Sequence, residues 1–122
     1  MTVSRVHARM LDGKRYVWHV DRLWALASDI APCQVQVNSL SALDSDCWFG
    51  DWCEPTLRNV ADHARRIYEA DLSYPILLGP EREVLDGVHR LAKAYLEGRP
   101  TVNAIAFKEL PNPDSIVALP SI

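Results

Sequence analysis

The segment 84–98 constrains the fold more than any other part of this chain. Glu83-Val84-Leu85 leads into Asp86-Gly87, and apolar residues then recur at helical spacing until Gly98. Glycine adopts backbone angles that other residues avoid, so Gly87 is suited to a direct junction between a strand and a helix. The segment therefore predicts a strand-turn-helix unit, and with it a domain that contains both a sheet and helices.

The rest of the chain completes an α/β (α+β) pattern with a small mixed sheet. Asp12-Gly13 lies between two extended runs and predicts an N-terminal β-hairpin over residues 1–20. Helices are expected near residues 21–29, 56–71 and 87–97. Strands are expected around residues 35–37, 74–78 and 101–110. Asp21 and Thr56 are the expected caps of the first two helices, and the tail 111–122, with three prolines, is expected to be irregular.

The helix expected over residues 56–71 has an apolar face, which predicts packing against the sheet. The members of that face recur at helical spacing: Leu57, Val60, Ala61, Ala64, Ile67 and Tyr68. The other side carries opposite charges one turn apart, at Arg58, Asp62, Arg65, Arg66 and Glu69. Such spacing is typical of a solvated helix face.

The length of 122 residues indicates one domain, 1–122. The net charge argues against sequence-independent nucleic-acid binding driven by overall charge. The 13 basic and 16 acidic residues give a net charge of −3, so DNA binding is not expected of this chain alone. No apolar run approaches the roughly 20 residues that span a bilayer, and no signal peptide is evident. We expect a cytoplasmic protein with no membrane association.

The cysteines do not form a recognisable metal or disulfide pattern. Cys33, Cys47 and Cys53 are an odd set in a chain of moderate apolar content. Cys47 and Cys53 could ligate a metal together with His63, but they lack the close pairing that marks a zinc site. Free thiols and no bound metal are therefore expected.

The segment 39–55 predicts a long loop rich in aromatic and acidic residues, and long ordered loops are often functional. Its aromatic residues are Trp48, Phe49 and Trp52. One interpretation is a partner-binding or lid loop, placed beside the turn at residues 86–90 or at a contact between two copies. The alternative is that these side chains fold back over the core of the domain.

The turn itself predicts a phosphate site. A helix N-terminus presents unpaired backbone N–H groups and the positive end of the helix dipole, and Gly87 occupies that place. His89 and Arg90 can add a hydrogen-bond donor and a permanent cation. Asp86 is expected to act as helix cap, as a carboxylate near a metal or as general base. The alternative is that Asp86 only caps, Gly87 only turns, and the other two side chains are solvated.

The run from Val84 to Ala94, which follows the strand at 75–78, resembles the core motif of the ParB/sulfiredoxin-like superfamily. In that superfamily a glycine-led turn that ends in arginine and precedes an alanine-rich helix binds nucleotide phosphates. The Asp-Gly-x-His-Arg form is most similar to small stand-alone bacterial ParB-like proteins and to the free-serine kinases. The resemblance covers residues 34–108 and is specific over 74–107.

The chain departs from two members of that superfamily at Val88. Sulfiredoxin has its catalytic cysteine at this place, so sulfiredoxin chemistry is not expected. ParB proper has a glutamate there, and the change to Val88-His89 removes a carboxylate from the nucleotide site. CTP hydrolysis is therefore in doubt, and neither a helix-turn-helix domain nor centromere binding is expected of this chain alone.

Three functions remain open from the sequence. The first is a nucleotide- or phosphometabolite-binding domain, acting as a phosphotransferase or nucleotide hydrolase if it is catalytic. In that case Asp86 and His89 would be catalytic, Gly87, His89 and Arg90 would bind phosphate, and magnesium would come from solution. The second is a non-catalytic interaction module that uses the loop 46–53, with a homo-oligomer as one outcome. The third is a DNA nuclease, which the acidic balance disfavours.

Overall fold

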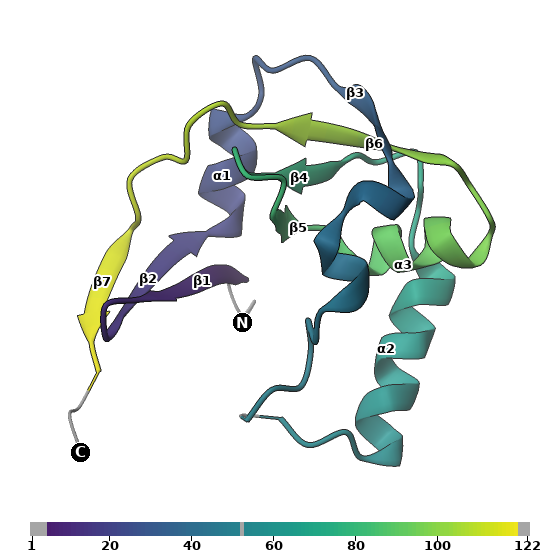
Figure 1. Cartoon of the computed structure of the whole chain (residues 1–122), viewed down its shortest axis with the longest axis horizontal. Coiled ribbons are helices and arrows are strands. Elements are labelled where there is room, and N and C mark those ends of the chain that lie inside the picture. The colour runs from purple at the N-terminus through teal and green to yellow at the C-terminus, as the bar shows by residue number, and fades with distance from the viewer. Residues whose placement is uncertain (1–4, 52, 120–122) are drawn as a thin grey trace.

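The computed structural model describes residues 5–51 and 53–119, which form two sheets and three α-helices (Figure 1). An antiparallel sheet has the order β1-β2-β7, and a mixed sheet has the order β3-β6-β4-β5. The strands are β1 (Val6–Leu11), β2 (Lys14–His19), β3 (Cys33–Gln36), β4 (Ile76–Leu78), β5 (Val84–Asp86), β6 (Thr101–Ala106) and β7 (Ser115–Ala118). The helices are α1 (Val20–Leu26), α2 (Leu57–Glu69) and α3 (Val88–Leu96), with short 3-10 helices η1 (Val37–Ser39) and η2 (Ser41–Asp44). The α+β class is confirmed, although the strands divide between two sheets.

Strand β4 lies inside the mixed sheet and is buried on both faces. It pairs with β6 in parallel and with β5 in antiparallel fashion, which places Ile76 opposite Ala104. Ile76 and Leu78 face the core beneath α3, whereas Leu77 faces a second core beneath α1. The alternation follows from the two-residue period of a strand. The buried strand that the apolar run predicts is confirmed.

The N-terminal hairpin expected over residues 1–20 is confirmed for residues 6–19, whereas residues 1–4 lie outside the described residues. Asp12 and Gly13 both have positive φ, 53° and 72°, and Leu11 pairs with Lys14 across the turn. A two-residue hairpin turn of this kind needs positive φ at both central positions, which Asp-Gly tolerates better than most dipeptides.

The prediction of an irregular C-terminal tail is wrong for residues 115–118. These residues form β7, which pairs with β2 so that Lys14 faces Ala118. The tail is also held by the Trp18 indole, which donates to the carbonyl of Pro111 at 2.7 Å. An edge strand carries unpaired backbone groups, and the tail satisfies those of β2. The two prolines at 111 and 113 precede β7 and do not interrupt it.

The start of α1 differs from the prediction. His19 is the N-cap and makes no side-chain capping bond, whereas Asp21 lies in the first turn of the helix. Asp21 therefore acts on the helix dipole without capping the chain end. The segment 39–55, expected to be a loop throughout, begins with the end of η1 and with η2.

The expected cap of α2 is confirmed, but its expected packing is wrong. The Thr56 hydroxyl accepts from the backbone N–H of Asn59 at 3.1 Å. The helix packs against α3 instead of a sheet, and Figure 1 shows it projecting past the end of α3. Most of its apolar stripe is exposed as a result.

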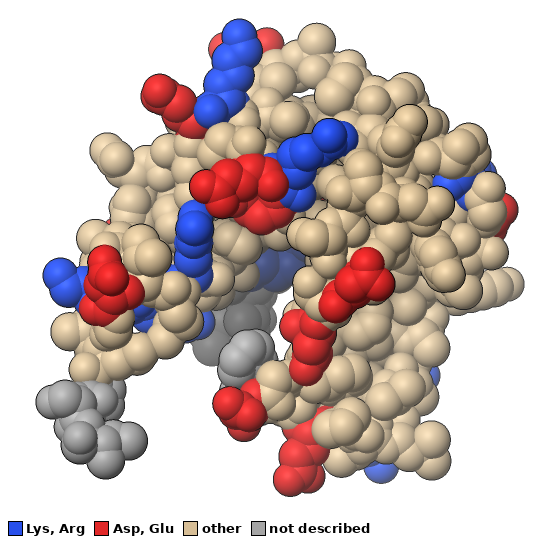
Figure 2. Space-filling view, in the orientation of Figure 1, with Lys and Arg blue, Asp and Glu red and all other residues tan. Residues whose placement is uncertain are grey.

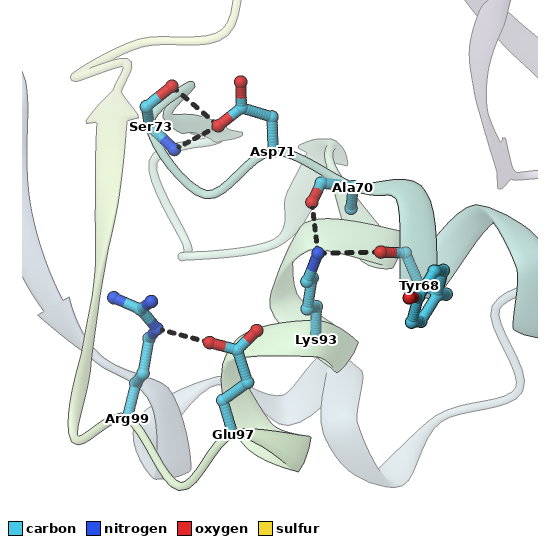
Figure 3. A network of polar contacts seen from close by, with 7 residues as sticks. All are labelled: Tyr68, Ala70, Asp71, Ser73, Lys93, Glu97 and Arg99. Atoms are coloured by element: carbon cyan, nitrogen blue, oxygen red, sulfur yellow. Dashed lines mark hydrogen bonds and ion pairs between the residues drawn. The ribbon is translucent and has the colours of Figure 1, made fainter.

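Lys93 of α3 fixes the C-terminal end of α2 (Figure 3). Its ammonium donates to the carbonyls of Tyr68 and Ala70, both at 2.7 Å. The last carbonyls of a helix have no intrahelical donor, and a cation there also complements the helix dipole. Just beyond, Asp71 accepts from the backbone and hydroxyl of Ser73 and so shapes the connection to β4.

Gly87 joins β5 to α3 at a point of very close approach. Its φ is +107°, and a Cβ built on it would lie 2.8 Å from Cγ2 of Ile76 and 3.2 Å from the Ile76 Cα. Both the backbone angle and the lack of space exclude a side chain. The start of α3 is thus fixed directly against β4.

Replacing Gly87 by Ala should lower the free energy of unfolding by about 2–4 kcal/mol, because backbone strain and the clash with Ile76 add. Gly98→Ala is the matched control, since Gly98 also has positive φ (+71°) but open space around it. That variant should cost only about 1 kcal/mol. Urea unfolding of both proteins measures the difference, and equal costs would contradict the close-packing argument.

Candidate functional site

The N-terminus of α3 lies at the end of β5, where the first amides of the helix have no partner within it. The first intrahelical bond runs from the N–H of Leu91 to the carbonyl of Gly87, at 3.0 Å. The amides of Val88, His89 and Arg90 come before that bond and make none inside the helix. Gly87 is the N-cap, so the prediction that Asp86 caps the helix is wrong.

A pair of histidines lies on one side of this helix start. Nδ1 of His63, on α2, is 2.9 Å from Nε2 of His89, on the first turn of α3. The ring centroids are 5.1 Å apart and the planes are inclined by only 12°. An imidazole nitrogen lies about 1.1 Å from its ring centre, so these distances place the rings side by side in nearly one plane. One N–H therefore joins the two rings in an in-plane hydrogen bond.

Trp48 covers both imidazole rings. Its ring centroid is 4.6 Å from that of His63 and 5.1 Å from that of His89, with nearly parallel planes. Phe49 meets Trp48 and His63 edge-on. The prediction that the aromatic loop lies beside the turn at 86–90 is confirmed for Trp48, and the third aromatic residue, Trp52, lies outside the described residues.

The loop that carries Trp48 is held by one carboxylate. Asp46 accepts from the backbone N–H groups of Trp48, Phe49 and Gly50, at 3.2, 2.8 and 2.7 Å. These bonds lower the pKa of Asp46 below its usual value, because they favour the ionised form. The indole Nε1 of Trp48 is buried and has no hydrogen-bond partner among the described residues. The closed loop thus leaves one buried donor unsatisfied.

Both histidines are neutral at pH 7. Burial, together with the neighbouring His63 and Arg66, lowers the pKa of His89 to about 4 against the opposing effect of Asp86. Burial and Arg66 also lower the pKa of His63. In a neutral pair that shares one N–H, one outer ring nitrogen carries a proton and the other accepts one. The pair therefore presents a donor and an acceptor at its two ends.

Asp86 is already engaged on the other side of the helix start. Oδ1 accepts from Arg5 at 3.0 Å and Oδ2 accepts from the Trp24 indole at 2.8 Å, and the side chain is 11% exposed. The carboxylate thus ties β5 to α1 and to the chain before β1. Each oxygen therefore already accepts one hydrogen bond within the fold.

The Arg90 side chain makes contacts within the fold, so it is not merely solvated. Nη1 donates to the carbonyl of Pro75 at 2.6 Å, and the guanidinium lies 6.0 Å from the Trp24 ring centre. Pro75 comes directly before β4, so Arg90 joins the first turn of α3 to the start of that strand. A guanidinium has five N–H donors, which leaves others for a ligand.

A cavity of about 130 Å³ adjoins Trp48. It is lined by residues of η2, of the aromatic loop and of α3: Ala42, Leu43, Ser45, Cys47, Trp48, Val88, Leu91 and Ala92. A separate and wider hollow is visible in Figure 2 between the sheet that contains β1 and β2 and the part of the molecule that contains α2. Basic side chains lie inside this hollow. Acidic side chains lie along the rim on the α2 side (Figure 2).

The structure brings Gly87, His89 and Trp48 together, as predicted, and adds His63. The sequence suggests a role for His63 only as a metal ligand with Cys47 and Cys53, whereas its partner in the structure is His89, 26 residues away. The one sequence feature that could have indicated a role for His63 is its position outside the apolar face of α2. Within residues 5–51 and 53–119 no cluster of three metal-ligating side chains occurs, and the three cysteines are free.

Among the described residues, no helix combines the length and the apolar character needed to cross a bilayer. No protein-family model, curated protein or solved structure matches this chain.

Acidification should destabilise the fold through His89. Its pKa is near 4 in the folded protein and 6.5 in the unfolded chain, so the unfolded state binds the proton more tightly. The contribution of neutral His89 to the free energy of unfolding is fully present above pH 6.5 and is lost as the pH falls from 6.5 towards 4. Urea unfolding at several pH values should show a smaller loss for His89→Gln than for the wild type. Parallel losses in both proteins would show that His89 does not titrate in this way.

Arg90→Ala should lower the free energy of unfolding by about 1.5–3 kcal/mol, because the Pro75 carbonyl loses a charge-assisted hydrogen bond. Arg99→Ala is the control, because Arg99 makes only an exposed ion pair with Glu97. Equal stability of the two variants in urea would refute a structural role for Arg90.

Proposed function

We propose that this chain binds a nucleotide or another phosphorylated small molecule, with a phosphate group at the N-terminus of α3. The observation that carries the proposal is the set of three amides at residues 88–90 that have no partner within the helix and lie next to a neutral histidine pair. Arg90 belongs to the same turn, and Arg5 binds Asp86 just before it. Amides and dipole favour an anion at this place, and arginine binds phosphate oxygens with directed donors. The resemblance of residues 84–94 to the ParB/sulfiredoxin-like motif points to the same class of ligand.

The aromatic loop supports a ligand with a flat ring. Trp48 covers His63 and His89, and its buried indole N–H has no partner among the described residues, which is a free-energy cost of this loop position. Movement of the loop would expose an indole face beside the helix start, and an indole stacks on any nucleobase. A nucleotide would use both features at once.

The histidine pair gives the site a route for protons. When one outer nitrogen takes up a proton, the shared proton shifts between Nδ1 of His63 and Nε2 of His89, and the other outer nitrogen releases one. Neutral imidazoles can act in this way at pH 7. The chemistry that fits is phosphoryl transfer or hydrolysis, with the pair accepting a proton from the attacking hydroxyl group or water. Because both oxygens of Asp86 have partners within the fold, we assign the proton transfer to the histidines.

The proposal is tested first with unmodified protein and a panel of nucleotides, with inorganic phosphate as the simplest probe. A nucleotide present at about 100 times its Kd should stabilise the fold by roughly 2.7 kcal/mol, which thermal shift detects. Absence of stabilisation by every nucleotide and by phosphate would overturn the proposal.

Calorimetric titration of the best nucleotide then locates the site. His89→Ala should weaken binding by about threefold to tenfold, because one neutral hydrogen bond and part of the stacked cluster are lost. Arg99→Ala is the matched control, since Arg99 lies beyond the other end of α3. A nucleotide that binds both variants as tightly as the wild type would place its site elsewhere.

A further inference from the structure

Helix α2 exposes the apolar stripe that its sequence would place against a core. Leu57 is 88% exposed, Tyr68 is 81% exposed and Val60 is 46% exposed. Ala61 and Ala64 are exposed between them. These five residues, which we call the α2 stripe, recur at spacings of three and four, so they lie on one side of the helix. Burial of apolar surface is the main source of stability in proteins, and an uncovered stripe of this kind indicates a docking surface.

The orientation of α2 is set from its other side. His63 is turned to His89 by an in-plane hydrogen bond, and Lys93 binds the two carbonyls at the C-terminal end of the helix. A helix cannot bury His63 and the α2 stripe against the same neighbour, because they occupy different sides. The stripe is therefore exposed as a consequence of the site.

The order of large and small side chains in the stripe is self-complementary. When a second copy of α2 is laid antiparallel with Ala61 opposite Ala64 of that copy, Leu57 falls opposite its Tyr68. Small residues at the middle let two helices approach closely, and large ones at the ends cover each other. The side-chain sizes of the α2 stripe are therefore complementary to those of a second, antiparallel α2 stripe.

The charges along one edge of the stripe follow the same register. Arg58, Asp62, Arg65 and Glu69 recur at spacings of four, three and four, which places them along a single edge. Equal edges of two antiparallel helices lie side by side. Arg58 then faces Glu69 of the second copy, and Asp62 faces Arg65. The charged pairs and the apolar pairs are centred on positions of α2 that differ by one residue, so both sets fit nearly the same antiparallel alignment.

We propose that the α2 stripe joins two copies of this chain as an antiparallel helix pair. The occupant is a second copy because both the side-chain sizes and the charges match the reversed α2 sequence. A helix of 13 residues is about 20 Å long, so the contact is small and belongs to the transient class of interfaces. The proposal is independent of ligand binding at α3.

Sedimentation equilibrium of the full chain without ligand, from about 5 μM to about 500 μM, should show a monomer–dimer equilibrium. Ala61→Glu places a bulky charge at the middle of the pair and should leave the protein monomeric throughout that range. Circular dichroism confirms that this variant is folded. A wild-type chain that stays monomeric at every concentration would overturn the proposal.

A charge exchange tests the register and separates it from any other mode of association. Arg58→Glu and Glu69→Arg should each weaken the dimer by about tenfold, since each creates two like-charge contacts across the pair. The double variant should restore the dimer, although the repulsions inside each helix add together. Arg66→Glu is the control for charge, because Arg66 lies on the far side of α2. A dimer unaffected by the single exchanges, or not restored by the double one, would show that α2 does not form the contact.

Discussion

The contact between Gly87 and Ile76 is the constraint on which the rest of the structure depends. Ile76 is fully buried in the centre of the mixed sheet, and α3 begins where the backbone of Gly87 rests against it. No side chain fits between them, so the start of the helix is fixed relative to β4 within very narrow limits. The amides of residues 88–90 and the side chains of His89 and Arg90 take their positions from this one contact. A rigid element supplies the precision that a binding site needs, and a loop would not.

The candidate site forms around that fixed helix start from parts of the chain that are distant in sequence. On one side, Asp86 accepts hydrogen bonds from Arg5 and Trp24. On the other, His89 is hydrogen-bonded to His63 and stacked against Trp48. Burial keeps the imidazoles neutral near pH 7, so each ring has one nitrogen that donates a hydrogen bond and one that accepts. The same arrangement turns His63 inward and leaves the α2 stripe outside. The orientation of α2 therefore determines both the position of His63 in the site and the exposure of the α2 stripe.

Local patterns predicted elements whose physical cause is local. Asp12-Gly13 specifies the hairpin through its tolerance of positive φ, and Thr56 caps α2 with its own hydroxyl. The buried strand β4 follows from an uninterrupted apolar run. Patterns failed where a distant partner decides the outcome. The tail forms β7 because β2 offers an open edge. The amphipathic α2 turns its apolar side outward because His89 binds His63 on a different side of the helix, while Lys93 binds the carbonyls at its C-terminal end.

The sequence by itself determined the α+β class, the glycine junction before α3 and the presence of a helix start suited to an anion. These properties depend on backbone angles and on residues that are neighbours in the chain. Only the tertiary structure decided that His63 pairs with His89, that Trp48 covers both rings, and that Arg90 binds the Pro75 carbonyl. Such contacts join segments 15 to 41 residues apart, and no local spacing encodes them. Their cause is the packing of α2 and the aromatic loop on a helix that Gly87 had already fixed.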